Sequence, residues 1–184
     1  MLTVETSRLI IRNFRPSDAT DLRRMILQYS SSPYGKYDHK WPTSEKEVQG
    51  IADWFAAGDQ YLAVTLKENR RFIGFISLST SGDPERSEYS LGYIFDESYR
   101  GTGYATEGCM ALIGHAFEEL KAHQVVTGTA AVNKPSRRLL ARLGFRKVSE
   151  GHAHLQDAPD GTSIDFLGFN YELTREEWMR KQLP

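Results

Sequence analysis

The stretch RGTGYATE, residues 100–107, decides how this chain is interpreted. It joins a strand-like run, residues 88–95, to an amphipathic run, residues 103–121. Gly101 and Gly103 allow a tight turn and leave no side chain over the backbone N–H groups. Because these N–H groups lie at the positive end of the following helix, the stretch predicts a binding site for a phosphate or diphosphate.

This turn does not match two common phosphate-binding motifs. A dinucleotide-binding loop has the pattern Gly-x-Gly-x-x-Gly, and Thr106 stands at the third glycine position. A Walker-type loop needs Gly-Lys-Ser/Thr after four spacer residues, and the sequence has none. A third alternative, a turn that merely opens a helix, stays open on the glycine pattern alone.

The composition indicates an ordinary soluble globular protein, and we expect one domain over residues 1–184. The chain is 40% hydrophobic and 26% charged, with a formal net charge of −1. A nucleic-acid-binding protein usually has an excess of basic residues, so this protein is not expected to bind nucleic acid. The single cysteine excludes an internal disulfide, and no run approaches the roughly 20 apolar residues of a membrane span. With no secretory signal at the N-terminus, these features favour a cytoplasmic protein without membrane contact.

Hydrophobic periodicity predicts a mixed α/β chain of the order β-α-α-β-β-β-α-β-α-β-β, with one mixed sheet and helices on its faces. Ser44 and Glu47 form a predicted capping box, and Gly144 a predicted helix end. The expected strands are residues 2–14, 61–66, 71–79, 88–95, 125–132, 146–155 and 163–173. The expected helices begin at 16, run over 44–58, 103–121 and 135–142, and begin again at 174; residues 29–42 form a loop, and 67–70 and 82–84 form turns.

This order, with several spaced motifs, resembles the GNAT superfamily of acyl-CoA-dependent N-acyltransferases. The pyrophosphate loop of that family, Gln/Arg-x-x-Gly-x-Gly/Ala, is matched by Arg100, Gly103 and Ala105. The family also has an asparagine after the next strand and then a helix that ends in Gly-Phe. Here these are Asn133 and residues 144–145.

Four further stretches are similar to the RimJ/RimL-like branch, which contains ribosomal-protein N-terminal acetyltransferases and many other acetyltransferases. They are residues 6–12 (TSRLIIR), 92–93 (GY), 103–107 (GYATE) and 175–178 (REEW). The resemblance covers essentially the whole chain. It implies a GNAT fold, acetyl-CoA as cofactor, and a primary amine as acceptor, on a protein N-terminus or a small molecule. The protein is expected to be a monomer or a homodimer.

The resemblance also implies how the cofactor is held. The pantetheine arm would lie along residues 93–95, beside a splayed neighbouring strand, and a backbone N–H there would stabilise the oxyanion of the thioester. The side chains of Tyr93 and Phe95 are equally explained by core packing. The implied cofactor-binding residues are Tyr93, Ile94 and Phe95 on the strand, and Arg100, Gly101, Thr102, Gly103, Tyr104 and Ala105 in the loop.

Residues of the next helix are further candidates for cofactor contact. Asn133 can cap that helix or bind the arm of the cofactor, and the two roles are compatible. Ser136 can contact the arm, protonate the departing thiolate, or be an incidental surface serine. Arg137 and Arg138 can be solvated charges or meet the 3′-phosphate.

The proton-handling residues are not evident. A lysine amine has a pKa of ~10.4 and an α-amine ~8, so the nucleophile must lose a proton. The family often places a tyrosine acid where this chain has Leu140, and the branch often has glutamate where it has Ala141. We therefore expect Glu88 or Ser90 as base or water-holding group and Ser136 as acid; a solvated carboxylate is the alternative for Glu88.

The missing acid also favours a second hypothesis, a non-catalytic module that binds or senses acyl-CoA. For an enzyme, Cys109 lies on an apolar helix stripe, so direct transfer without an acyl-enzyme is expected. His152 and His154 share a strand face but lack further ligands, so no metal site is expected. An acceptor pocket is predicted from the aromatic loop at residues 29–42, with Asp38 and Glu88 suited to a cationic amine; a loop that packs on its own aromatic residues is the alternative. The pocket candidates are Tyr34, Tyr37, Asp38, His39, Trp41 and Trp54.

Overall fold

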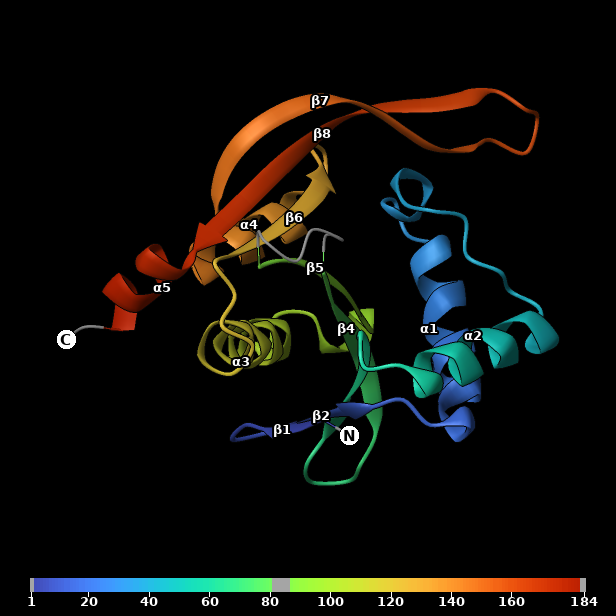
Figure 1. The fold of residues 1–184 in the computed structure, drawn as a ribbon. Coiled ribbons are helices and arrows are strands. Elements are labelled where there is room, and N and C mark those ends of the chain that lie inside the picture. Colours follow the sequence, from blue (N-terminus) through green and yellow to red (C-terminus); the bar gives the residue numbers. More distant parts are fainter. Residues whose placement is uncertain (1, 81–86, 183–184) are drawn as a thin grey trace.

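The computed structural model describes residues 2–80 and 87–182, and in these residues an eight-stranded mixed sheet runs through the molecule (Figure 1). The order of the strands is β1-β2-β3-β4-β5-β6-β8-β7, and all neighbours are antiparallel except β5 and β6. The strands are β1 (Thr3–Glu5), β2 (Leu9–Asn13), β3 (Tyr61–Leu66), β4 (Phe72–Thr80), β5 (Glu88–Phe95), β6 (Gln124–Ala130), β7 (Arg146–Asp157) and β8 (Ser163–Thr174). The α-helices are α1 (Ala19–Ser30), α2 (Glu45–Ala57), α3 (Tyr104–Glu118), α4 (Lys134–Leu143) and α5 (Arg175–Gln182), with short 3-10 turns at Pro16–Asp18, Gly35–Tyr37 and Glu97–Tyr99.

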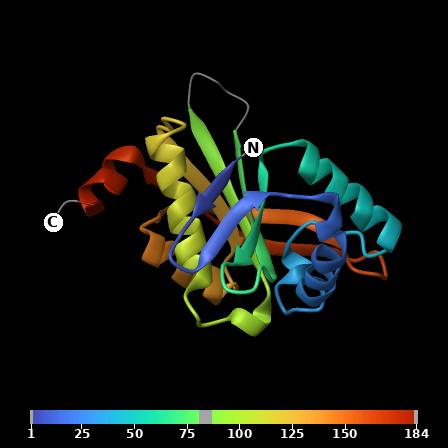
Figure 2. The same ribbon diagram turned by 90° about the horizontal axis from the view of Figure 1, so that it is seen from below.

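Helices cover the two faces of the sheet. Figures 1 and 2 show α3 on one side of the central strands and α1 and α2 on the other. The apolar faces of α3 and α4 bury Leu112, Phe117 and Leu140 against the sheet, whereas α1 and α2 bury Met25 and Phe55 on the opposite face. Strands β3 and β4 are therefore buried on both faces, which explains their nearly continuous apolar runs.

Most predicted elements are confirmed. The strands at 61–66 and 88–95 have the predicted bounds, the helix predicted to begin at 174 is α5, and the mixed α/β order holds with one added strand at the N-terminal end. The Ser44 hydroxyl accepts a hydrogen bond from Glu47 N (3.3 Å), and Gly144 ends α4 with a φ of 98°. The turn predicted at residues 82–84 lies outside the described residues.

The single strand predicted over residues 2–14 is wrong, because this segment is a hairpin of β1 and β2. Thr6 N donates to the Leu9 carbonyl (3.0 Å), and the Thr6 hydroxyl accepts from Leu9 N (2.9 Å). A threonine side chain that bonds nearby backbone groups competes with continued strand pairing, so the chain turns at residues 6–8.

Two other boundaries also differ from the prediction. The loop expected over 29–42 contains the end of α1 and a 3-10 turn at Gly35–Tyr37. The helix expected to run to Lys121 ends at Glu118, so Leu120 is 40% exposed instead of buried. Lys121 has a φ of 58°, which a continued helix does not allow.

The two parallel strands at the centre separate early. Residues 88–90 of β5 pair with residues 124–126 of β6, and no further pairs between them occur in the described chain. On its other side, β5 stays paired with β4 as far as Phe95. The rest of β5 therefore has one free edge, which faces an opening between the strands.

The end of β5 is fixed by a buried carboxylate. Asp96 is 2% exposed and accepts hydrogen bonds from the Arg24 guanidinium, from Gln28 Nε2 (3.3 Å) and from Ser98 N (2.9 Å). Burial opposes its ionisation, but the hydrogen bonds from Arg24, Ser98 and Gln28 outweigh burial and lower the pKa of Asp96 to about 2. Helix α1 is thereby tied to the start of the loop that follows β5.

Replacing Asp96 should lower the free energy of unfolding and should make that free energy less dependent on pH in the acid range. An unfolded aspartate has a pKa of ~3.9, so Asp96 stabilises the fold above that pH, and the contribution is lost as pH falls toward about 2. We expect Asp96→Asn to lower the free energy of unfolding by about 2 kcal/mol at pH 7. Urea titrations between pH 7 and pH 2 should also show a shallower acid dependence, whereas the exposed-site control Asp59→Asn should behave as wild type. An unchanged dependence in Asp96→Asn would contradict this assignment.

Candidate active site

A cavity of about 840 Å³ lies at the opening between β5 and β6. Pockets that bind small molecules usually have volumes of ~300–1,000 Å³, so this one can hold a sizeable ligand. Its walls come from the free edge of β5, from β6, α4 and the loop after β5, and from the α1–α2 connection and the β7–β8 hairpin. One end of the cavity thus faces the glycine turn at residues 101–105, and the other end faces the aromatic loop at residues 29–42.

The glycine turn presents free backbone donors to this cavity. Gly101 and Gly103 have φ values of 83° and 86°, in the left-handed region that favours glycine. The N–H groups of Arg100 and Thr102 are already bonded to the carbonyls of Glu97 (3.0 Å) and Tyr99 (3.4 Å). No acceptor among the described residues takes the remaining N–H groups of the turn and the first turn of α3, which are those of Gly101, Gly103, Tyr104, Ala105 and Thr106.

Hydroxyl groups lie deeper, where α4 approaches β5. The Tyr93 hydroxyl is 2.8 Å from Ser136 Oγ, and both residues line the cavity. Burial, together with the nearby Cys109, raises the pKa of Tyr93 well above its usual range, so it stays protonated at neutral pH. Asn133 Oδ1 accepts from Ser136 N (3.2 Å), which makes Asn133 the N-cap of α4 and places Ser136 in its first turn.

The other predicted residues of β5 divide into two groups. Ser90, Ile94 and Phe95 line the cavity. Glu88 is not among the described cavity-lining residues; it lies where β5 and β6 are still paired, and its carboxylate accepts from Gln124 Nε2. The structure therefore brings Ser90 to the site but not Glu88.

The far end of the cavity contains a carboxylate that no hydrogen bond or ion pair within the described chain joins to a cationic side chain. Asp38 accepts hydrogen bonds from the Tyr29 hydroxyl (3.0 Å) and from His39 N (2.7 Å), and all three residues line the cavity. Burial, with the nearby Asp38 charge, raises the pKa of Tyr29 far above its usual range. Tyr29 was not predicted, because its contact depends on the course of the loop that follows α1.

The β7–β8 hairpin closes this end of the cavity. Gln156 Nε2 donates to the backbone carbonyls of Gly35 (2.9 Å) and Asp38 (2.7 Å), and Tyr37 packs edge-to-face on Phe166 at 5.4 Å between ring centroids. In Figure 1 the hairpin extends beyond β6 toward the end of α1. Sequence reasoning missed the hairpin as a wall, although it predicted its strands.

Two of the predicted aromatic residues lie elsewhere. Trp41 is half-buried and packs against the core beneath α1 and α2, with its ring centroid 5.9 Å from that of Phe75. Trp54 is 61% exposed on α2, beside Tyr61. The acceptor pocket predicted from the sequence therefore keeps its tyrosines, Asp38 and His39, but not its tryptophans.

The arginines of α4 have separate positions. Arg138 and Arg142 line the cavity. Arg137 instead donates to the Ala131 carbonyl (2.9 Å) and lies over the Phe169 ring at 5.0 Å from its centroid. Only the first two can therefore meet a bound anion without leaving a structural contact.

Other chemistry finds no support in the described part of the chain. No three histidine, cysteine, aspartate or glutamate residues within it are placed to hold a metal ion. Cys109 is buried, and burial raises the pKa of its thiol, so a reactive thiolate is not available there. None of the helices of residues 2–80 and 87–182 has the length and apolar character needed to cross a membrane.

Comparison with known proteins agrees with this geometry. Residues 8–146 match the family described as "Acetyltransferase (GNAT) domain". The chain is 35% identical over 157 residues to the FsC-acetyl coenzyme A-N(2)-transacetylase of Aspergillus fumigatus. The matched region covers 79% of this chain and 60% of that enzyme's own length. It is 25% identical over 177 residues to YnaD of Bacillus subtilis, named as an uncharacterized N-acetyltransferase, covering 95% of the chain and 98% of YnaD.

The fold is also that of a solved bacterial enzyme. The crystal structure of the ribosomal-protein-S5-alanine acetyltransferase from Vibrio fischeri superimposes with a TM-score of 0.76 at 19% identity, covering 97% of this chain and 99% of that one. The resemblance expected from the sequence is thus confirmed by the family match and by the shared fold. The chain belongs to the GNAT family of acetyltransferases, in which an acetyl group is transferred to an amine.

Proposed function

We propose that this protein binds acetyl-CoA in the cavity between β5 and β6 and transfers the acetyl group directly to a primary amine. The observation that carries the proposal is the free edge of β5, which leads to a turn where the N–H groups of Gly101, Gly103, Tyr104 and Ala105 have no acceptor within the described residues. The name of the Aspergillus fumigatus relative specifies acetyl coenzyme A as its donor, which supports the same donor here.

The residues of the cavity fit the parts of this donor in order. The free N–H groups of Gly101, Gly103, Tyr104 and Ala105, at the positive end of α3, would bind the diphosphate. Arg138 and Arg142 would meet the 3′-phosphate, and the free edge of β5 at residues 93–95 would bond the amides of the pantetheine arm. This order directs the thioester toward Tyr93 and Ser136.

The chemistry needs one bond formed and one broken. The amine nitrogen bonds to the acetyl carbon, the carbon–sulfur bond breaks, and the departing thiolate takes a proton. We assign that proton to the hydrogen-bonded hydroxyls of Tyr93 and Ser136, which stand in for the tyrosine that the family has at the position of Leu140. A backbone N–H near residue 94 would stabilise the developing oxyanion.

Asp38 is our candidate for recognition of the acceptor. It lines the far end of the cavity, and within the described chain its carboxylate accepts only from uncharged donors. Such a carboxylate favours an acceptor that carries a protonated amine, and it can also accept the proton, directly or through water, before attack. Both a protein N-terminus and a small polyamine meet this description.

The first test concerns the diphosphate site. Gly101 and Gly161 both have a φ of 83° and open space where a Cβ would stand, so substitution strains both alike. Gly101→Asp adds a negative charge at the cavity and should weaken CoA binding at least about tenfold, whereas Gly161→Asp should bind as wild type. Calorimetric titration with CoA measures both. Equal affinities in the two variants would refute the placement of the diphosphate.

The second test concerns the hydroxyl pair. Ser136→Ala and Tyr93→Phe should each lower kcat about tenfold with little change in the KM for acetyl-CoA, because the pair acts on the leaving group. Since the pKa of Tyr93 is raised, the wild-type rate should not decline from pH 8 to pH 10 through loss of this acid. Tyr89→Phe, on the same strand but not among the described cavity residues, is the matched control. A full wild-type kcat in both variants would exclude the pair.

The third test concerns the acceptor. Asp38→Asn should raise the KM for a diamine or an α-amino peptide about tenfold and leave the KM for acetyl-CoA within about twofold, because only the acceptor meets this carboxylate. Thiol release from acetyl-CoA with a panel of primary amines measures both constants. If the KM for acetyl-CoA rose and that for the amine did not, Asp38 would belong to the donor site instead.

A further inference from the structure

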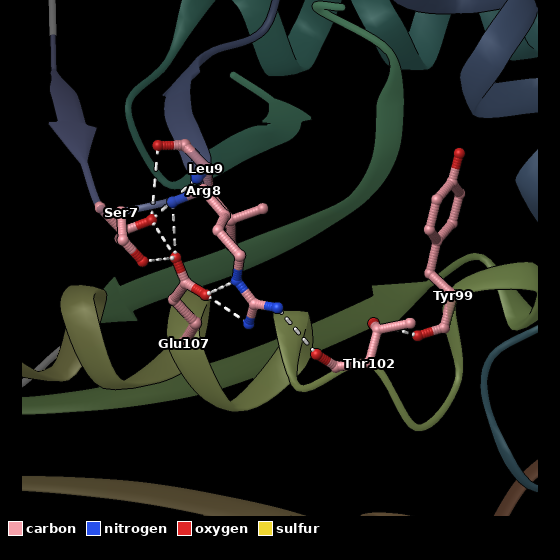
Figure 3. Close-up of polar contacts among 7 residues, drawn as sticks. Ser7, Arg8, Leu9, Tyr99, Thr102 and Glu107 are labelled. Carbon is pink, nitrogen blue, oxygen red and sulfur yellow. Dashed lines mark hydrogen bonds and ion pairs between the residues drawn. The ribbon is translucent and has the colours of Figure 1, made fainter. Parts of the chain in front are cut away.

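A second group of contacts surrounds the glycine turn and comes from the other end of the sequence. The Glu107 carboxylate, in the first turn of α3, accepts hydrogen bonds from the hydroxyls of Thr6 (2.6 Å) and Ser7 (3.0 Å) and from Arg8 N (2.9 Å). Those three bonds are to Glu107 Oε1, whereas Glu107 Oε2 accepts from Arg8 Nε (2.6 Å) and pairs with Arg8 Nη2 (2.6 Å). Figure 3 shows how the β1–β2 turn meets this carboxylate.

The same arginine reaches the glycine turn itself. Arg8 Nη1 donates to the Thr102 carbonyl (3.0 Å), and the guanidinium lies over the Tyr104 ring, 4.4 Å from its centroid. A Cβ placed on Gly103 would stand 3.3 Å from Arg8 Nη2. One guanidinium therefore contacts the helix carboxylate and the backbone of the turn together, as Figure 3 shows for Glu107 and Thr102.

The contact with Thr102 determines where the next N–H points. The peptide bond between Thr102 and Gly103 is trans and planar, so its C=O and its N–H point in opposite directions. Because the carbonyl is held toward Arg8, the Gly103 N–H is turned to the opposite side. Gly103 lines the cavity and Thr102 is not among its described lining residues, in agreement with this orientation.

The contact with Glu107 removes an electrostatic conflict. A carboxylate in the first turn of a helix uses the positive helix end that a bound anion would also need. Alone, Glu107 would repel a diphosphate at the neighbouring amides. The Arg8 charge offsets it, and the hydrogen bonds to Glu107 keep the pair together although the Arg8 side chain is 46% exposed.

We propose that Arg8 is a positioning residue for the diphosphate: it aims the Gly103 N–H into the cavity and cancels the charge of Glu107 next to it. The inference rests on the proposed binding of CoA at this turn. It assigns to the stretch at residues 6–8 a role that its place on a β1–β2 turn does not indicate.

The two parts of this role can be separated by variants. Arg8→Ala loses the orientation and leaves the Glu107 charge uncompensated, so CoA affinity should fall about tenfold or more. Arg8→Lys keeps the charge but cannot span both partners, and should lie between Arg8→Ala and wild type. Adding Glu107→Gln to Arg8→Ala should recover about threefold or more of the lost affinity. A purely structural role predicts no such recovery, since the double variant has lost more contacts.

The measurement is the Kd for CoA by calorimetry, with thermal unfolding to confirm that each variant is folded. Arg180→Ala, which breaks an arginine–glutamate pair on α5, is the matched control and should bind as wild type. If Arg8→Ala binds CoA within twofold of wild type, or if the double variant binds no more tightly than Arg8→Ala, the inference is wrong. If wild type itself does not bind CoA, the proposed function fails instead.

Discussion

The site depends on one constraint in the sheet: β5 and β6 stop pairing after Ser90 and Val126, while both strands continue. Parallel strands that stay paired leave no room between them, whereas separated strands leave backbone groups that need another partner. The cavity occupies this opening, and the glycine turn follows directly at the end of β5. A ligand that is extended, carries amides and ends in a diphosphate satisfies the strand edge and the turn together.

The loop that connects β5 to α3 is held at both ends by a carboxylate paired with an arginine from the N-terminal part of the chain. Asp96 pairs with Arg24 at one end, and Glu107 pairs with Arg8 at the other. In both cases hydrogen bonds overcome burial and lower the pKa of the carboxylate to about 2. The amides between them are thus fixed before a ligand arrives, which reduces the ordering cost of binding.

The sequence alone supplied the glycine turn, the strand before it and the family, because these features are local and follow regular periods. It did not supply the contacts that join distant segments, such as Arg8 with Glu107 or Tyr29 with Asp38. Such contacts depend on the course of loops, which periodicity does not describe. Glu88 illustrates the same limit, since its strand was predicted correctly but the point at which β5 leaves β6 was not visible in the sequence.

Besides the ring contact of Tyr37 with Phe166, the β7–β8 hairpin is joined to the α1–α2 connection by Gln156, which bonds to the carbonyl oxygens of residues 35 and 38. A bond to a carbonyl oxygen is insensitive to the side chain at that position. The side chains at positions 34 and 39, which also line the cavity, are therefore free to vary while the two segments remain joined. Related proteins can in this way differ in the acceptor molecule that they modify, while the contacts that close the cavity stay the same.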